Sequence, residues 1–300
     1  MDIRLNEPLA AYTTFKIGGP ADFFVEVSSF QDLRAALGWA CEKGVRYLLL
    51  GGGSNVLIDD AGLRGLVIRN RLTSIEFEPG HRVCALSGTP LDDLVAASIE
   101  QGLEGLAFAS GIPGSVGGAV CGNAGAFGRA VGDPLVEARV MSPGGRIGTV
   151  PNEYFRFGYR DSRLKCQGGL VIEVRFQLGP GEPERLRQER EEALALRRQK
   201  HPGPEIWSAG SFFKNMKTSE GEVLAAGRLL DQVGAKGLSV GDAAVYAKHA
   251  NILINRGAAS SADVLALAQL LFEKVKARFG VELEREVRYI PPQGFPQSSR

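Results

Sequence analysis

The hydrophobic pattern of the first fifty residues predicts a strand, a helix and a second strand. An apolar run at 23–27 is typical of a buried strand. Ser28 or Ser29 then begins a helix whose apolar side chains recur at helical spacing as far as Gly44. Residues 45–50, VRYLLL, predict the second strand, and GGGSN follows at once. A βαβ unit that delivers a glycine loop places at least part of the fold in the α/β class.

Periodicity also predicts the elements of the remaining chain. They are a helix from Thr89 to Gly102, strands at 135–141 and 170–178, a charged helix at 182–200, an amphipathic helix from Ser261 to Gly280, and a strand at 281–290. The charges of the 182–200 helix are acidic first and basic last, which suits a helix dipole, and we interpret them as a solvated face. HPGPE at 201–205 interrupts the pattern and is the predicted domain boundary.

Composition narrows the classes of protein to which the chain can belong. The 300 residues favour two domains, and a net charge of +1 argues against a nucleic-acid or membrane-surface partner. The first ten residues show no signal-peptide pattern, and no apolar stretch is long enough to span a membrane. Four dispersed cysteines without a CxxC pair and only three histidines argue against a metal site. We therefore expect a cytoplasmic protein with reduced cysteines.

Two glycine loops are the strongest local signal. Glycines after a strand let backbone N–H groups converge on an anion. One such loop is often only a tight turn, whereas two in one chain point to a ligand with a diphosphate. The predicted cofactor-binding residues are Gly51, Gly52, Gly53, Ser54, Asn55, Gly111, Gly114, Ser115, Gly117 and Gly118.

The spacing of these loops excludes three common sites. The chain contains no GxxxxGK[ST] motif, so a P-loop is excluded. It contains no GxGxxG motif, which excludes an ordinary Rossmann dinucleotide site. It also contains no GxSxG motif, the nucleophile elbow of hydrolases.

The strand followed by GGGSN, with GIPGSVGGAVCGNAG downstream, resembles the FAD-binding core of vanillyl-alcohol-oxidase-type flavoproteins. Further segments resemble one family, the UDP-N-acetylenolpyruvoylglucosamine reductases. They are TTFKIGGPAD at 13–22, YRDSRLK at 159–165, GSFFKN at 210–215, KHANILIN at 248–255 and LEREVR at 283–288. The resemblance covers nearly the whole chain in order.

This resemblance implies a mixed α/β and α+β fold with two domains. We expect a two-lobed FAD-binding domain at 1–200, with lobe one at about 1–60 and lobe two at about 61–200. A substrate-binding domain follows at 201–300, and its last strand is a candidate to return to the FAD domain. The implied reaction is the reduction of UDP-N-acetylglucosamine enolpyruvate to UDP-N-acetylmuramate in peptidoglycan synthesis. FAD is the implied cofactor and NADPH the hydride donor. We expect a monomer or weak oligomer.

The motifs also imply which residues act on the substrate. Arg160 matches an arginine that would hold the substrate carboxylate, Glu286 a glutamate that would help polarise the enolate, and Ser211 the proton donor to the α-carbon. The implied substrate-binding residues are Asn215, Tyr159 and Lys214. Without the resemblance, Arg160 would be assigned to a surface ion pair, Ser211 to a turn and Glu286 to a solvated strand face.

Two departures from the wider family qualify this interpretation. Only about fifty residues separate Arg160 from Ser211, which resembles the shorter subgroup that lacks a tyrosine-bearing loop over the substrate. No histidine lies at the positions where covalently flavinylated relatives carry one, so we expect FAD to bind non-covalently. Two alternatives stay open: another flavoenzyme of the same fold, such as an alcohol or hydroxy-acid oxidase, and a non-catalytic nucleotide-sugar-binding protein without flavin.

Overall fold

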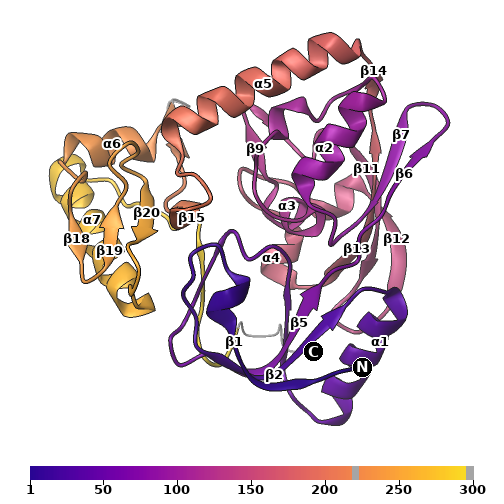
Figure 1. The fold of residues 1–300 in the computed structure, drawn as a ribbon, viewed down its shortest axis with the longest axis horizontal. Helices are drawn as coiled ribbons and strands as arrows, with labels where there is room; N and C mark the ends of the chain where they lie inside the picture. The colour runs from indigo at the N-terminus through magenta and orange to yellow at the C-terminus, as the bar shows by residue number, and fades with distance from the viewer. Residues whose placement is uncertain (218–222, 295–300) are drawn as a thin grey trace.

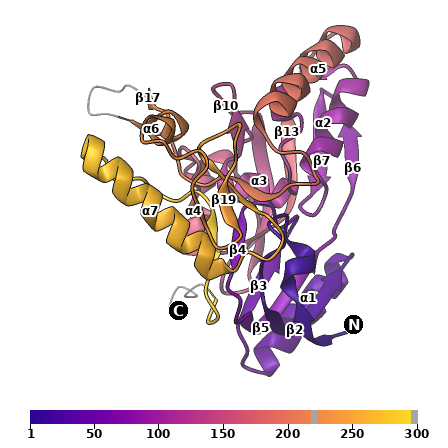
Figure 2. The same cartoon turned by 60° about the vertical axis from the view of Figure 1, so that its left-hand side comes forward.

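The computed structural model describes residues 1–217 and 223–294, and its three sheets of four or five strands are each accompanied by helices (Figure 1). The C-terminal body carries α6 (Ala226–Gln232) and α7 (Ser261–Phe279) and lies to one side of the two lobes that contain the other large sheets (Figure 1). Helix α5 (Pro183–Lys200) runs along one edge of the molecule and links the lobes to the C-terminal body (Figure 1). The turned view shows α7 lying obliquely across the C-terminal body, on the opposite side from α5 (Figure 2).

The first sheet contains the predicted βαβ unit. Its strands in spatial order are β1 (Arg4–Pro8), β2 (Pro20–Val27), β5 (Leu63–Asn70) and β3 (Tyr47–Leu50). Helix α1 (Phe30–Glu42) begins at Ser29, whose Oγ accepts a hydrogen bond of 3.1 Å from the Asp32 amide. Because β5 lies between β2 and β3 and is parallel to both, this sheet extends beyond the lobe boundary expected near residue 60.

The second sheet is antiparallel throughout. Its order is β12 (Ile147–Pro151), β11 (Leu135–Met141), β13 (Leu170–Gln177), β7 (Arg82–Leu86) and β6 (Ile75–Glu78). The associated helices are α2 (Leu91–Glu100), α3 (Val116–Gly122), α4 (Arg163–Gln167) and α5 (Pro183–Lys200). The strands expected at 135–141 and 170–178 are therefore confirmed. Helix α2 begins one residue later than expected, because Pro90 is its N-cap and not its first residue.

The two lobes share a hydrophobic core. Met141, Leu170 and Ile172 of the second sheet pack with the buried side chains of α1 and the first sheet. A second cluster lies between α2, α3 and the inner face of the second sheet. The shared core fixes the glycine loops of the two lobes relative to each other.

The C-terminal body is a small antiparallel sheet covered by two helices. Its strands in order are β15 (Trp207–Ser211), β20 (Ile252–Asn255), β19 (Ala243–Val245) and β18 (Ser239–Val240), and its helices are α6 (Ala226–Gln232) and α7 (Ser261–Phe279). The expected cap of α7 was wrong by one residue. Ser260 is the N-cap and forms a capping box with Asp263, whereas Ser261 donates through Oγ to Asp60 Oδ2 at 2.8 Å.

The final segment is a strand only at its end, contrary to the strand expected over 281–290. β21 (Arg288–Ile290) pairs in parallel with β4 (Val56–Ile58), which follows the first glycine loop. The residues before it hydrogen-bond to the segment after β15, with the Lys214 amide donating to the Glu284 carbonyl at 2.8 Å. The chain end thus brings the C-terminal body against the first loop.

The remaining elements are short. They are the pairs β8 (Leu103–Glu104) with β14 (Gly179–Pro180), β9 (Gly125–Ala126) with β10 (Arg129–Ala130), and β16 (Met216–Lys217) with β17 (Val223–Leu224), and the 3-10 helices at Leu9–Tyr12, Ala107–Ala109 and Asn152–Phe155. Within the described residues, no helix is long and apolar enough to cross a membrane. The same part of the chain brings together no group of three acidic, cysteine or histidine side chains that could hold a metal ion.

Candidate active site

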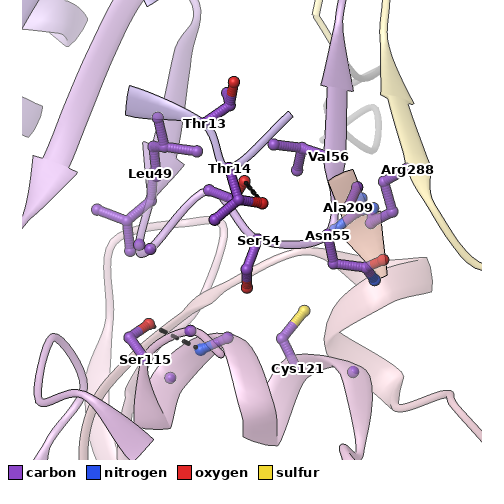
Figure 3. A pocket seen from close by; sticks show the side chains of 18 of the residues that line it. Thr13, Thr14, Leu49, Ser54, Asn55, Val56, Ser115, Cys121, Ala209 and Arg288 are labelled. Atoms are coloured by element: carbon purple, nitrogen blue, oxygen red, sulfur yellow. Dashed lines mark hydrogen bonds between the residues drawn. The ribbon is translucent and has the colours of Figure 1, made fainter. Parts of the chain in front are cut away.

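One large cavity, of about 2250 Å³, collects the two glycine loops and residues from all three sheets. All ten predicted cofactor-binding residues line it, and so do Arg160, Ser211 and Glu286. The close view shows the GGGSN loop facing α3, with Ser54 pointing toward that helix and Cys121 pointing from the helix toward the loop (Figure 3). The sequence motifs thus include both the glycine loops and the predicted catalytic residues that line this cavity.

The two glycine loops touch each other as well as the cavity. A Cβ at Gly52 would lie 3.0 Å from the Gly114 Cα, and one at Gly114 would lie 2.7 Å from the Ser54 Oγ. Ser54 Oγ also donates to the Pro113 carbonyl at 3.0 Å. Close contact between the loops is therefore one reason for glycine here, in addition to the approach of a ligand.

The second glycine loop is fixed by α5. The Gly111 amide donates to Asp92 Oδ1 at 2.7 Å, and Arg190 of α5 binds both oxygens of that carboxylate, at 2.6 and 2.7 Å. The hydrogen bonds from Arg190 are the largest cause that lowers the Asp92 pKa. The carboxylate stays ionised and joins the loop to the helix.

Arg160 and Glu286 form an ion pair inside the cavity. The Nε of Arg160 lies 3.1 Å from Glu286 Oε1, and the two side chains are only 24% and 17% exposed. Arg160 has a φ of +55°, a left-handed conformation that costs energy for a residue with a side chain. The Arg160 carbonyl accepts a hydrogen bond from Lys165 Nζ, and both residues belong to the YRDSRLK motif. The fold therefore holds this arginine in a constrained position.

Glu286 is held through its backbone. Its amide donates to the Phe212 carbonyl at 2.8 Å, and Asn55 Nδ2 donates to its carbonyl at 3.4 Å. Burial raises the pKa of the Glu286 carboxyl, while Arg160 and, less strongly, Lys165 oppose that shift. The side chain thus has a raised affinity for a proton at a position where it also pairs with a guanidinium.

Ser211 reaches the cavity from the end of β15. It pairs with Ile252, and Gly210 before it has a φ of +76°. Gly210 lies within β15 where the pairing register shifts, and its left-handed conformation explains the glycine of the GSFFKN motif. Arg160, Ser211 and Glu286 therefore come from three separate parts of the chain to one cavity.

The three predicted substrate-binding residues lie outside the cavity lining, as far as the described residues define it. Asn215 Oδ1 accepts the Ala226 amide at 3.0 Å, in the first turn of α6. Lys214 pairs through Nζ with Glu284. Tyr159 is 52% exposed, and the Arg160 guanidinium lies 5.6 Å from its ring centroid. Their part in substrate binding stays a prediction.

Comparison with known proteins identifies the family. A family profile described as the C-terminal domain of UDP-N-acetylenolpyruvoylglucosamine reductase matches residues 201–290, and an FAD binding domain profile matches residues 21–150. The reductase of Geotalea uraniireducens is 42% identical over 96% of this chain and 94% of its own, and that of Moorella thermoacetica 40% identical over 96% and 93%.

The chain belongs to the UDP-N-acetylenolpyruvoylglucosamine reductase family. A solved structure of this reductase from Thermus caldophilus has a TM-score of 0.79 and 33% identity, and the match covers 96% of this chain and 98% of that one. The resemblance found in the motifs and the mixed α/β fold are confirmed. The chain is an FAD-containing oxidoreductase of this family.

The cavity of this reductase fits FAD at the glycine loops. Gly117 and Gly118 line the cavity beside Gly51–Gly53, and all five present backbone alone to it. Gly118 is the one of these five at which a Cβ would make no contact closer than 3.4 Å. A Cβ at Gly117 would lie 2.8 Å from the Ser87 Cβ. The residues that would hold the cofactor are those of the two loops, with Ser54 and Asn55 as added side-chain donors.

Sequence reasoning missed several cationic or titratable residues of the cavity, of which three bear on the site. Lys165, Arg197 and His201 all line it. Burial lowers the pKa of His201 to about 4 and is the main cause that lowers the pKa of Lys165. Lys165 lies in the recognised YRDSRLK motif, which was an available signal. Arg197 and His201 gave none, because the highly charged helix that ends with Lys200 is typical of a solvated face.

Proposed function

We propose that this reductase converts UDP-N-acetylglucosamine enolpyruvate to UDP-N-acetylmuramate, with NADPH as hydride donor, in peptidoglycan precursor synthesis in the cytoplasm. The observation that carries the proposal is the buried Arg160–Glu286 pair in the same cavity as Ser211 and both glycine loops. This combination offers an anion clamp, a carboxyl with raised pKa and a hydroxyl beside a cofactor site.

Bound at the glycine loops, FAD would supply hydride-transfer chemistry between NADPH and the β-carbon of the enolpyruvyl group. Arg160 would hold the substrate carboxylate, on which negative charge develops as an aci-carboxylate enolate. Its guanidinium can form two parallel hydrogen bonds to a carboxylate. The pair with Glu286 orients the guanidinium before the substrate arrives.

Ser211 would deliver a proton to the α-carbon of the enolate. A serine hydroxyl is a poor acid and needs a nearby cation or proton relay. Lys214 is paired with Glu284, whereas Arg160 and Lys165 are among the cationic residues that line the cavity with Ser211. Glu286 in its protonated form would hydrogen-bond the enolate oxygen. Asn215, Lys214 and Tyr159 are proposed to contact the UDP-sugar at the edge of this site.

The activity assay is NADPH oxidation that depends on the enolpyruvyl sugar nucleotide. We expect a yellow protein that oxidises NADPH only when this substrate is present. Oxidation of an alcohol or hydroxy acid in its place would favour another flavoenzyme of the same fold. A purified protein without flavin absorbance would favour a nucleotide-sugar-binding protein.

The mode of FAD attachment is tested on the same preparation. The only described histidines that line the cavity or lie near it, His201 and His249, are on the C-terminal side and have lowered pKa values caused mainly by burial. We expect denaturation to release intact FAD into the supernatant. Flavin that stays with the precipitated chain would contradict non-covalent binding.

A further inference from the structure

Arg197, in the last turn of α5, has a buried guanidinium atom without a partner. Its Nε is inaccessible to solvent and makes no hydrogen bond within the described residues. Over residues 1–217 and 223–294, no carboxylate forms an ion pair with it, whereas Arg190 on the same helix binds Asp92 through two nitrogens. The Asp92 carboxylate attracts this guanidinium, but the two form no ion pair in the described part of the chain. A buried donor without an acceptor is costly, so Arg197 has a reason other than packing to face the cavity.

Arg197 lies against the second glycine loop. A Cβ at Gly111 would be 3.1 Å from the Arg197 Cδ and 3.7 Å from its Nε. Gly111 and Arg197 both line the large cavity, and the positive charge of Arg160 is close enough to repel that of Arg197. Burial is the main cause that lowers the Arg197 pKa, and the repulsion from Arg160 adds to it. Several arginines line the cavity, among them Arg160, which pairs with Glu286, and Arg197, which forms no ion pair within the described residues. This concentration of guanidinium groups favours an anionic ligand.

We propose that Arg197 binds the diphosphate of a nucleotide in this cavity. A guanidinium matches phosphate oxygens by parallel hydrogen bonds, and the adjacent loop offers backbone where a diphosphate can approach. Two ligands carry this group: FAD, whose binding domain the chain contains, and the UDP-sugar, which rests on the proposed function. Arg197 lies between the two matched profiles, at 21–150 and 201–290, so neither covers it.

Helix α5 would then contribute to ligand binding through two residues. Arg190 holds the second glycine loop through Asp92, and Arg197 holds the diphosphate beside that loop. The two residues lie on one side of the helix, about two turns apart. The charged helix is therefore more than a solvated face at its C-terminal end.

The test compares Arg197→Gln with Arg187→Gln in the full chain. Arg187 is an exposed arginine of the same helix, paired with Glu100 and Glu184, so the control removes the same charge outside the cavity. Each protein is stripped of FAD and titrated with FAD and with riboflavin, which lacks phosphate, by flavin fluorescence. Each holoenzyme is then titrated with UDP and with uridine by calorimetry.

We expect Arg197→Gln to weaken either FAD or UDP by about 10- to 100-fold and to leave riboflavin or uridine unchanged. Loss of FAD affinity alone assigns the cofactor diphosphate, and loss of UDP affinity alone assigns the substrate. Arg197→Lys should restore part of the affinity that Gln removes. Unchanged binding of both diphosphates, or equal weakening of riboflavin and FAD, would overturn the proposal. Wild-type protein that binds FAD but not UDP would instead contradict the proposed substrate.

Discussion

The Nε of Arg160 lies 3.1 Å from Oε1 of Glu286, and this pair joins the second lobe to the end of the chain. Arg160 belongs to the turn before α4, and Glu286 to the segment that hydrogen-bonds with Phe212. The pair can form only when the C-terminal body is docked against the FAD-binding lobes. Its geometry therefore depends on the whole fold.

The guanidinium fork of Arg160 should be essential beyond its charge. We expect Arg160→Lys to lower turnover about as much as Arg160→Ala, by at least about 10²-fold, because an ammonium cannot hold both Glu286 and a substrate carboxylate by directed hydrogen bonds. Steady-state kinetics with the enolpyruvyl substrate measure this. Arg163→Lys is the matched control, since Arg163 is a partly buried neighbour outside the cavity lining that bonds Gln167 and lies over the Tyr154 ring. Near-normal turnover of Arg160→Lys would show that charge alone suffices.

Glu286 should make the stability of the fold pH-dependent in a defined direction. Burial raises its pKa in the folded state, so the native protein binds a proton more tightly than the unfolded chain does. The contribution of Glu286 to stability is thus fully present below the ordinary glutamate pKa. It is lost as pH rises through the raised native pKa.

Glu286→Gln isolates this effect. We expect the unfolding free energy of the wild type, minus that of Glu286→Gln, to fall as pH rises across that window, in urea denaturation at a series of pH values. The variant should also lose substrate reduction while it keeps FAD. A difference that increases with pH would mean that the attraction of Arg160 outweighs burial.

Lys165 should act as a positioning residue for Arg160. Its Nζ donates to the carbonyl of Arg160, whose left-handed backbone needs support. We expect Lys165→Met to lower kcat by about 10-fold, with Lys165→Arg restoring part of it. Because Lys165 lowers the Glu286 pKa and Glu286 is proposed to act in its protonated form, removal of Lys165 should also shift the alkaline limb of the kcat profile to higher pH. A lower kcat with an unchanged pH profile would indicate a general packing defect.

The glycine loops call for a test that separates folding from cofactor binding. Gly52→Val should unfold or purify without FAD, since its side chain would meet the Gly114 backbone. Gly118→Ala is more informative, because its Cβ would make an ordinary 3.4 Å contact with Ser115 Oγ at the cavity wall.

We expect Gly118→Ala to keep the wild-type Tm within a few degrees and to weaken FAD binding, measured by flavin fluorescence. Gly38→Ala in α1, where a Cβ meets nothing within 4 Å, is the control and should be neutral or stabilising by up to about 1 kcal/mol. Normal FAD affinity in Gly118→Ala would place the diphosphate away from α3.

The periodic elements were predictable from sequence because their apolar stripes face cores. This applies to α1, to the strands at 135–141 and 170–178, and to α7, whose bounds differ by only a few residues from the prediction. Helix α5 was predicted instead from its run of charges, acidic first and basic last, and its buried residues are Leu186 and Ala193. The structure of the segment before β21 was not predictable, because its alternating charges resemble those of a strand. Its backbone instead bonds to the segment after β15, a tertiary contact that no local pattern encodes.

The cavity residues that belong to sequence motifs were predictable. Those that line the cavity only because of tertiary packing were not. The motifs predicted that the glycines, Arg160, Ser211 and Glu286 share one site; all of them line the cavity, and their roles stay predictions. Arg197 was not predictable, because only the packing of α5 against Gly111 turns one arginine of a charged helix into a cavity residue.

The most direct test of the proposed reaction is a sequential-mixing experiment on Ser211→Ala. The variant is first reduced with NADPH, and then the enolpyruvyl substrate is added while flavin absorbance is followed. Flavin bleaching should proceed at about the wild-type rate, since that half of the reaction needs no proton from Ser211. Reoxidation by the substrate should slow by at least about 10²-fold, the usual contribution of a positioned general acid. Reoxidation at the wild-type rate would contradict the assignment of Ser211, and equal slowing of both halves would show a flavin-binding defect in its place.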